Sequence, residues 1–157
     1  MAYEKREKLH IVVALAVIRN PEGKYLVLKR HGGEIVGPGN YTVPGGKVEG
    51  NDSIEETLQK EAMEEAGVEL LPGKVFLCDH TFVRPDGQTA KVFVYFCSTG
   101  DWTKAKAGED FTDYKWVFPS ELAEIPHFEI IERYLKAAEE LVAKGFDLRK
   151  LHAKSLK

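Results

Sequence analysis

The sequence predicts a single α/β domain, residues 1–157, in which a mixed β-sheet lies between helices. Two amphipathic helical segments, 54–66 and 128–144, are separated by apolar segments rich in β-branched residues, which are typical of strands. A chain of 157 residues suits one hydrophobic core, and no repeat, low-complexity tract or linker divides it. We expect the two helices to cover opposite faces of the sheet.

The strands are expected at residues 10–19, 24–30, 41–43, 75–84, 90–99 and 114–118. The first is apolar almost throughout, which is typical of a strand at the centre of a sheet. We expect it to form a hairpin with the second strand through a turn at 20–23, and a turn at 85–88 to join another hairpin. Gly45 and Gly46 are expected to form a turn, where the missing Cβ atoms permit positive φ or a close backbone approach to a ligand.

The helix at 54–66 has clear signals at both ends. Ser53 is a favourable N-cap, and Glu56, three residues later, completes a capping box. Gly67 is the natural residue to end the helix, because glycine adopts the left-handed conformation of a helix C-terminus without steric cost.

The core-facing side of that helix is apolar in its first part and acidic toward its end. Its apolar residues lie four apart and form one stripe: Ile54, Leu58 and Ala62. Where the stripe should continue, the sequence places Glu61 and Glu65, with Glu64 beside them. Carboxylates this close repel one another, and partial burial adds a desolvation cost. Either a divalent cation that prefers oxygen ligands, Mg²⁺ or Mn²⁺, compensates these charges, or the glutamates form a solvated acidic face.

The stretch 46–68 resembles the sequence box of the Nudix hydrolase family, G-x5-E-x7-R-E-U-x-E-E-x-G-U, in which U is a bulky aliphatic residue. The matching residues are Gly46, Glu61, Glu64, Glu65, Gly67 and Val68, and four residues outside the box also look like the family: Tyr41, Pro44, Gly45 and Trp116. Three positions depart from the box, with Asp52 in place of Glu, Lys60 in place of Arg and Ala62 in place of an aliphatic residue. The resemblance implies a three-layer α/β/α sandwich around a mixed sheet.

The resemblance also implies the residues of a metal site. Glu61, Glu64 and Glu65 are the expected metal ligands, and either Glu64 or Glu65 is alternatively the general base. The backbone at Gly45 and Gly46 is expected to add a carbonyl ligand to the metal or to make room for the substrate.

Residues outside the central glutamates are expected to assist. In the family, a loop before the Trp-containing strand often supplies a further carboxylate, and loop 100–111 offers Glu109 as a catalytic residue, with Asp110 next to it. A solvated acidic loop would have the same composition. Lys60 carries the charge of the family arginine without its bidentate fork, and Asp52 is one methylene shorter than Glu; both are expected to orient the site.

Two cations are candidate substrate-binding residues, together with the backbone of Gly46. Arg30 lies at the end of the strand at 24–30, and Arg84 lies at the tip of the later hairpin. The simpler interpretation of such strand-end cations is that they keep the edges soluble. His80 is expected to be a half-buried histidine of the sheet rather than a ligand or base, because no second histidine stands at metal-binding spacing.

The activity implied by the resemblance is metal-dependent hydrolysis of a phosphoanhydride bond in a nucleoside diphosphate-linked substrate. A nucleoside triphosphate or another small nucleotide is the first expectation, with ADP-ribose or a dinucleoside polyphosphate as alternatives. A Nudix-like module that binds or senses a nucleotide or sugar-nucleotide without cleaving it is the alternative function.

The overall composition argues against several other classes of protein. The net charge of −3 gives no basic footprint for nucleic acid, and no apolar run reaches the ~18 residues of a membrane span. The first ten residues are charged and lack the apolar core of a signal peptide, so we expect a cytoplasmic protein. The basic segment 146–157 is expected to be either a frayed tail or a contact in a homodimer.

Overall fold

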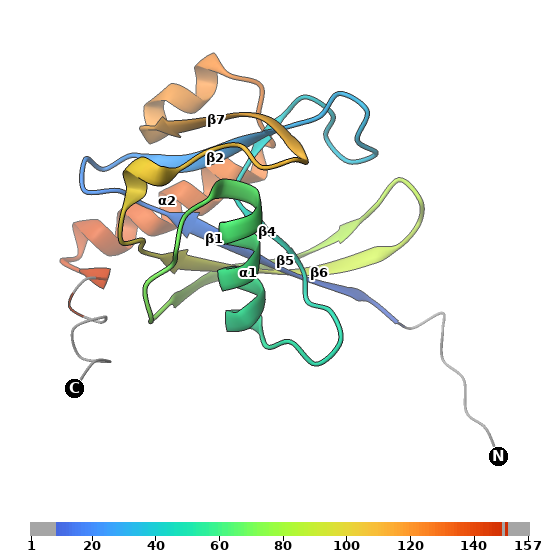
Figure 1. The fold of residues 1–157 in the computed structure, drawn as a ribbon, viewed down its shortest axis with the longest axis horizontal. Coiled ribbons are helices and arrows are strands. Elements are labelled where there is room, and N and C mark those ends of the chain that lie inside the picture. The colour runs from blue at the N-terminus through green and yellow to red at the C-terminus, as the bar shows by residue number, and fades with distance from the viewer. Residues whose placement is uncertain (1–8, 149, 151–157) are drawn as a thin grey trace.

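The computed structural model describes residues 9–148 and 150. Its strands form two sheets, which Figure 1 shows one above the other. The four-stranded sheet is mixed and has the order β4 (Gly45–Lys47), β1 (Ile11–Ile18), β6 (Thr89–Cys97) and β5 (Val75–Val83). The three-stranded sheet is antiparallel and has the order β3 (Tyr41–Thr42), β2 (Tyr25–Arg30) and β7 (Phe111–Val117). The predicted tail or dimer contact at 146–157 falls mostly outside the described residues.

Two α-helices lie on opposite sides of the mixed sheet, α1 (Ile54–Ala66) in front and α2 (Ile130–Ala143) behind in Figure 1. Two 3₁₀ helices, η2 (Trp102–Lys104) and η3 (Pro119–Glu124), connect the later elements. Within residues 9–148 and 150, no helix has the length and apolar character needed to cross a membrane.

The central strand β1 divides the core into two halves. It pairs in parallel with β6 and antiparallel with β4, and its side chains alternate between the two faces. Val13, Leu15 and Val17 pack into the core under α2, whereas Ala14, Ala16 and Ile18 pack into the core under α1. A strand buried on both faces explains why the segment is apolar almost throughout, and the expected two-sided covering by helices is confirmed.

The predicted ends of α1 are confirmed. The Ser53 hydroxyl accepts a hydrogen bond from the Glu56 amide at 3.0 Å, and the Glu56 carboxylate accepts one from the Ser53 amide at 3.2 Å. Gly67 ends the helix with φ of 68°, and its amide donates to carbonyls of the last turn. These caps fix the position of α1 along the chain, and with it the positions of the three glutamates.

The predicted hairpin between the first two strands is wrong. The two strands share only the bridge between Arg19 and Tyr25, after which β2 joins the other sheet. The Asn20 side chain builds the turn by accepting from the amides of Glu22 and Lys24. A turn of this kind reverses the chain but does not determine which sheet the second strand joins, because that depends on distant partners such as β7.

The predicted Gly45-Gly46 turn is also wrong, because both residues belong to β4 and pair antiparallel with β1. The missing Cβ atom of Gly45 instead permits a close approach to β1, since a Cβ there would lie 2.3 Å from the Ala14 carbonyl oxygen; the expected approach to a ligand stays a prediction. The last strand begins at Phe111, three residues before the predicted 114–118, since its polar start pairs with the end of β2.

Candidate active site

Two of the three central glutamates form a partly buried carboxyl pair on α1. The Glu65 carboxyl hydrogen-bonds the Glu61 carboxyl, and its Oε2 also accepts from the Gly45 amide at 3.3 Å. Burial, followed by the contact with Glu61, raises the pKa of Glu65 well above its usual range, and the Gly45 amide and Arg30 only partly oppose this. A hydrogen bond between two carboxyls requires that one of them is protonated, so the pair would carry one negative charge rather than two.

Strand β4 lies so close to α1 that position 46 leaves no room for a Cβ atom. A Cβ on Gly46 would lie 2.7 Å from Cδ of Glu61, so the Glu61 carboxyl rests against the bare Cα of that residue. Glycine at 45 and 46 therefore serves two contacts, one with β1 and one with the carboxyl pair on α1.

The segment before β7 packs on the C-terminal end of α1. The amides of Lys106 and Gly108 donate to the carbonyls of Ala66 and Glu65, at 2.9 and 2.8 Å. A Cβ on Gly108 would lie 2.3 Å from the Glu64 carbonyl oxygen, so this close packing requires glycine. Figure 1 shows the segment crossing over the end of α1 before β7 begins.

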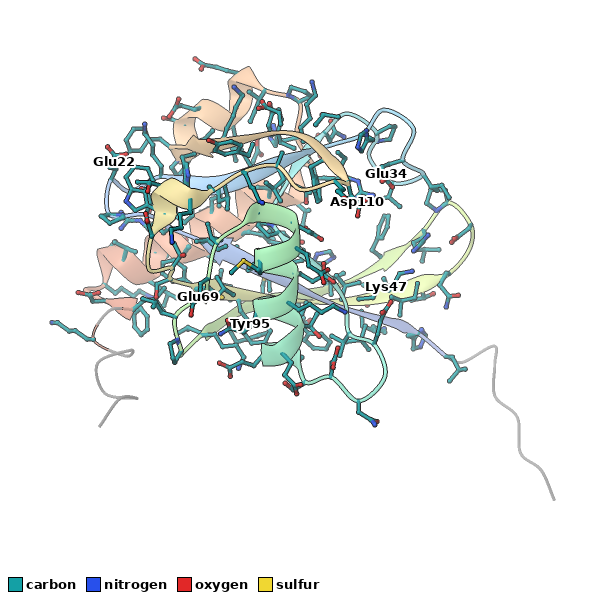
Figure 2. All side chains as sticks on the ribbon, in the orientation of Figure 1. Glu22, Glu34, Lys47, Glu69, Tyr95 and Asp110 are labelled. Carbon is teal, nitrogen blue, oxygen red and sulfur yellow. The ribbon has the colours of Figure 1, made fainter. Side chains whose placement is uncertain are left out.

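This packing creates an acidic cavity of about 590 Å³ beside α1. It is lined by five carboxylates and one cation: Glu61, Glu64, Glu65, Glu109, Asp110 and Lys106. Glu64 and Glu109 are exposed, and Asp110, labelled in Figure 2, lies beyond the C-terminal end of α1. The structure therefore brings the predicted loop carboxylate Glu109 to the same cavity as the three box glutamates.

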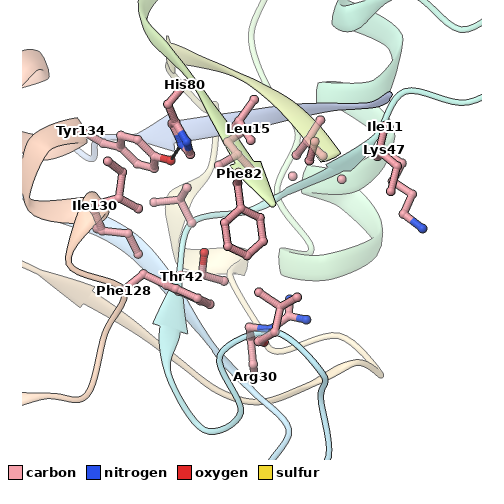
Figure 3. Close-up of a pocket in the computed structure, with 18 of the residues that line it drawn as sticks. Ile11, Leu15, Arg30, Thr42, Lys47, His80, Phe82, Phe128, Ile130 and Tyr134 are labelled. Carbon is pink, nitrogen blue, oxygen red and sulfur yellow. Dashed lines mark hydrogen bonds between the residues drawn. The ribbon is translucent and has the colours of Figure 1, made fainter. Parts of the chain in front are cut away.

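A second, largely apolar pocket of about 300 Å³ lies between the mixed sheet and the start of α2. Its lining includes Glu65, Arg30, Arg84, His80 and both glycines of β4. Figure 3 shows Arg30 on one side of the pocket and His80 on the other. Glu65 lines both cavities, so the acidic cavity and the apolar pocket meet at this carboxyl.

The two predicted substrate-binding arginines both line the apolar pocket. Arg30 donates to the Val36 carbonyl at 2.7 Å and to the Glu34 carboxylate at 3.0 Å, contacts that also fold the glycine-rich loop after β2. Arg84 pairs with Asp86 at 3.1 Å, and its buried Nε has no hydrogen-bond partner within the described part of the chain. Each guanidinium is held by a neighbour from its own loop.

Comparison with known proteins agrees with the sequence box. The family model described as NUDIX domain matches residues 8–138. The chain belongs to the Nudix hydrolase family. It is 31% identical over 127 residues to the nucleoside triphosphatase NudI of Escherichia coli strain K12, covering 75% of this chain and 86% of that protein.

Solved Nudix structures share the fold. The MutT protein of Methanosarcina mazei Go1 superimposes with a TM-score of 0.71 at 22% identity, covering 91% of this chain and all of that one. The NUDIX domain of Shewanella oneidensis NrtR, solved in complex with ADP ribose, gives 0.72 at 18% identity, covering 89% of this chain and 94% of that one. These similarities confirm the predicted α/β/α sandwich.

Two residues that depart from the Nudix box, Lys60 and Asp52, were expected to orient the site. Lys60 is exposed, and its ammonium group makes no ion pair or hydrogen bond with any described residue. Asp52 is half-buried in the turn before α1, where its amide donates to the Glu49 carbonyl at 3.0 Å. The orienting roles of both residues stay predictions.

The three glutamates of the Nudix box have the oxygen ligands that a divalent cation prefers, but their side chains are not arranged around one metal position. Among the residues that the structure describes, no three Asp, Glu, His or Cys side chains are placed to hold a metal ion together. The Glu61–Glu65 pair nevertheless offers hard oxygen donors whose shared proton a cation would replace. Glu64 is exposed and lines the same cavity as the pair. The donor set therefore fits Mg²⁺ or Mn²⁺.

Sequence reasoning missed several residues that line the Nudix site. Lys106 lies among the carboxylates of the acidic cavity, and its position in loop 100–111 beside Glu109 was a signal that pointed to it. His80 is half-buried on β5, as predicted, but it also lines the apolar pocket and contacts Tyr134. Tyr134 carried no such signal, because its spacing in α2 is that of an ordinary core residue.

Proposed function

We propose that this Nudix protein hydrolyses a phosphoanhydride bond of a nucleoside triphosphate or another small nucleotide, with Mg²⁺ or Mn²⁺ bound by Glu61, Glu64 and Glu65. One observation carries the proposal: Glu65 lines both the acidic cavity and the apolar pocket. A nucleotide has the same two-part character, with a charged polyphosphate joined to a nucleoside that prefers an apolar site. A nucleotide bound across Glu65 would place its phosphates at the carboxylates.

The similarity to a known enzyme supports the substrate class. The relative from Escherichia coli is named a nucleoside triphosphatase, and the alignment covers 86% of it. Substrate identity in such sites depends on the loops around the pocket, here the glycine-rich loop after β2 and the tip of the β5–β6 hairpin. ADP-ribose and dinucleoside polyphosphates are therefore alternative substrates of the same reaction.

In this proposal, different residues bind the metal, accept a proton from water and contact the phosphates. A bound divalent cation would neutralise the diphosphate and lower the pKa of a coordinated water. Glu61 and Glu65, which are partly buried against β4, would supply metal ligands. Glu64 and Glu109 are exposed in the same cavity, so either carboxylate is able to accept a proton from water and release it to solvent. Arg30 and Arg84 would contact substrate phosphates, as predicted from the sequence.

A binding or sensing module is the second candidate function, and two observations favour it. Lys60 is exposed and does not contact the carboxyl pair, and among the described residues no three Asp, Glu, His or Cys side chains are placed to hold a metal ion together. The NUDIX domain of Shewanella oneidensis NrtR, which shares this fold, was solved with ADP ribose. In a sensor, ADP-ribose or a nucleotide would bind in the apolar pocket and remain intact.

A substrate panel distinguishes the two functions. Purified protein is incubated with nucleoside triphosphates, ADP-ribose, dinucleoside polyphosphates and nucleotide sugars, each with Mg²⁺ and with Mn²⁺, and the products are separated by anion-exchange chromatography. Multiple turnovers with cleavage at a phosphoanhydride bond support the hydrolase. Saturable binding of one compound, recovered uncleaved from every metal condition, would support the sensor and reject the hydrolase.

A further inference from the structure

The apolar pocket holds one polar pair that neither the metal site nor the phosphates would use. The pocket wall comes mainly from apolar side chains of β1 and β6, among them Val13, Leu15 and Val92. On the side away from Lys47, Figure 3 shows the His80 imidazole and the Tyr134 hydroxyl joined by a hydrogen bond. The pair comes from two different elements, β5 and α2, which close the pocket together.

The hydrogen bond leaves one ring nitrogen of His80 for a ligand, because Tyr134 is only 1% exposed whereas His80 is half-buried. Burial, and secondly the charge of Arg133, lowers the pKa of His80 although Asp79 opposes this, so the imidazole is neutral near pH 7. If the Tyr134 hydroxyl donates to Nε2, then Nδ1–H of His80 is the remaining donor. If Nε2–H donates to the phenolic oxygen, then Nδ1 is the remaining acceptor.

Two aromatic rings lie beside this pair. Phe82 is on the same face of β5, two residues after His80, and stays 37% exposed although it is apolar. Phe128 lies across the pocket, where a Cβ on Gly37 would be 1.9 Å from its Cζ, so the glycine-rich loop fixes the tip of the ring. Partly exposed aromatic rings that line a pocket offer stacking surfaces to a planar ligand.

We propose that His80, whose tautomer is coupled to its hydrogen bond with Tyr134, recognises the hydrogen-bonding edge of the nucleobase, while Phe82 and Phe128 hold the plane of the base. This inference rests on the proposed function only in taking the ligand to be a nucleotide. His80 matches either a donor or an acceptor on the base edge, because a change of tautomer exchanges the two roles. It accepts both oxo and amino bases and discriminates against a base that lacks the exocyclic oxo or amino group.

The test compares the best natural nucleoside triphosphate with its analogue that lacks the exocyclic oxo or amino group. For a purine this is purine riboside triphosphate, and for a pyrimidine it is the triphosphate of pyrimidin-2-one riboside. Wild-type protein should favour the natural compound in kcat/KM by at least about tenfold, because a site built for a hydrogen bond rejects a ligand that lacks it. In both Tyr134→Phe and His80→Gln, the preference should fall to within about threefold.

The control variant is Thr81→Ala, on the outer face of the same strand, where Thr81 accepts a hydrogen bond from Lys91. It should keep the wild-type preference. The same comparison is made without catalysis, by calorimetric titration of the corresponding nucleoside monophosphates. Discrimination in binding together with no hydrolysis would reject the hydrolase and retain this inference. A preference equal in wild type and both pocket variants, or no preference in wild type, would overturn it.

Discussion

The replacement Glu65→Gln tests the carboxyl pair through stability alone. In the metal-free protein, the glutamine amide is able to donate to Glu61, and its carbonyl oxygen is able to accept from the Gly45 amide, so the variant keeps both contacts without a proton. Wild-type Glu65 has a pKa raised above its unfolded value of 4.5. Its stabilising contribution is therefore present at low pH and is lost as pH rises toward the raised pKa.

The size of the effect follows from the linkage between protonation and folding. Each pH unit within the window changes the free energy of unfolding by at most about 1.4 kcal/mol for one proton. Solvent rearrangement around the pair reduces this, so we expect Glu65→Gln to be more stable than wild type by roughly 1–3 kcal/mol at pH 8. The two proteins should differ little near pH 4.5, where about half of the unfolded carboxyl is also protonated.

The assay is urea denaturation in excess chelator at several pH values between 4.5 and 8. Glu64→Gln is the matched control, because it makes the same change one residue away at an exposed position, and its stability should follow wild type. Added Mg²⁺ should then stabilise wild type more than Glu65→Gln, since binding to the native state raises stability. Parallel pH profiles for wild type and Glu65→Gln would refute the account of the pair.

Three further substitutions test other contacts. Gly46→Ala should cost less than about 1 kcal/mol of stability in thermal melts, because the added Cβ would clash with the flexible end of Glu61. It should nevertheless lower kcat by at least about tenfold, because it displaces the Glu61 carboxyl. An unchanged kcat would contradict this. Lys60→Arg should hold or raise kcat in steady-state assays, since the exposed ammonium makes no contact that the change would break; a large loss in a folded variant would assign Lys60 its own role. Ser53→Ala should reduce the free energy of unfolding by about 1 kcal/mol in urea titrations, because the hydrogen bond from the Glu56 amide is lost. An unchanged free energy of unfolding would count against the capping box.

The features predicted correctly from the sequence depend on local chemistry. Ser53, Glu56 and Gly67 set both ends of α1 through contacts within a few residues, so the helix was predicted with its observed bounds. The position of Glu61 and Glu65 on the core-facing side followed from the helical period, and the structure confirms that they are partly buried. Signals of this kind need no knowledge of distant partners.

The features that were missed depend on contacts between distant segments. The chain after Asn20 joins a different sheet because β7, far along the sequence, pairs with β2. Gly45 and Gly46 resemble a turn in the sequence, yet their missing Cβ atoms make room for β1 and for Glu61. The contact between His80 and Tyr134 joins β5 to α2, and neither residue's spacing indicates a pocket.

Turnover of the best nucleotide substrate with and without divalent metal tests the central claim most directly. The account predicts phosphoanhydride cleavage with millimolar Mg²⁺ or Mn²⁺, none in excess chelator, and at least about a hundredfold lower kcat for Glu65→Gln under the same metal condition. Full turnover in excess chelator, or wild-type kcat in Glu65→Gln, would contradict it.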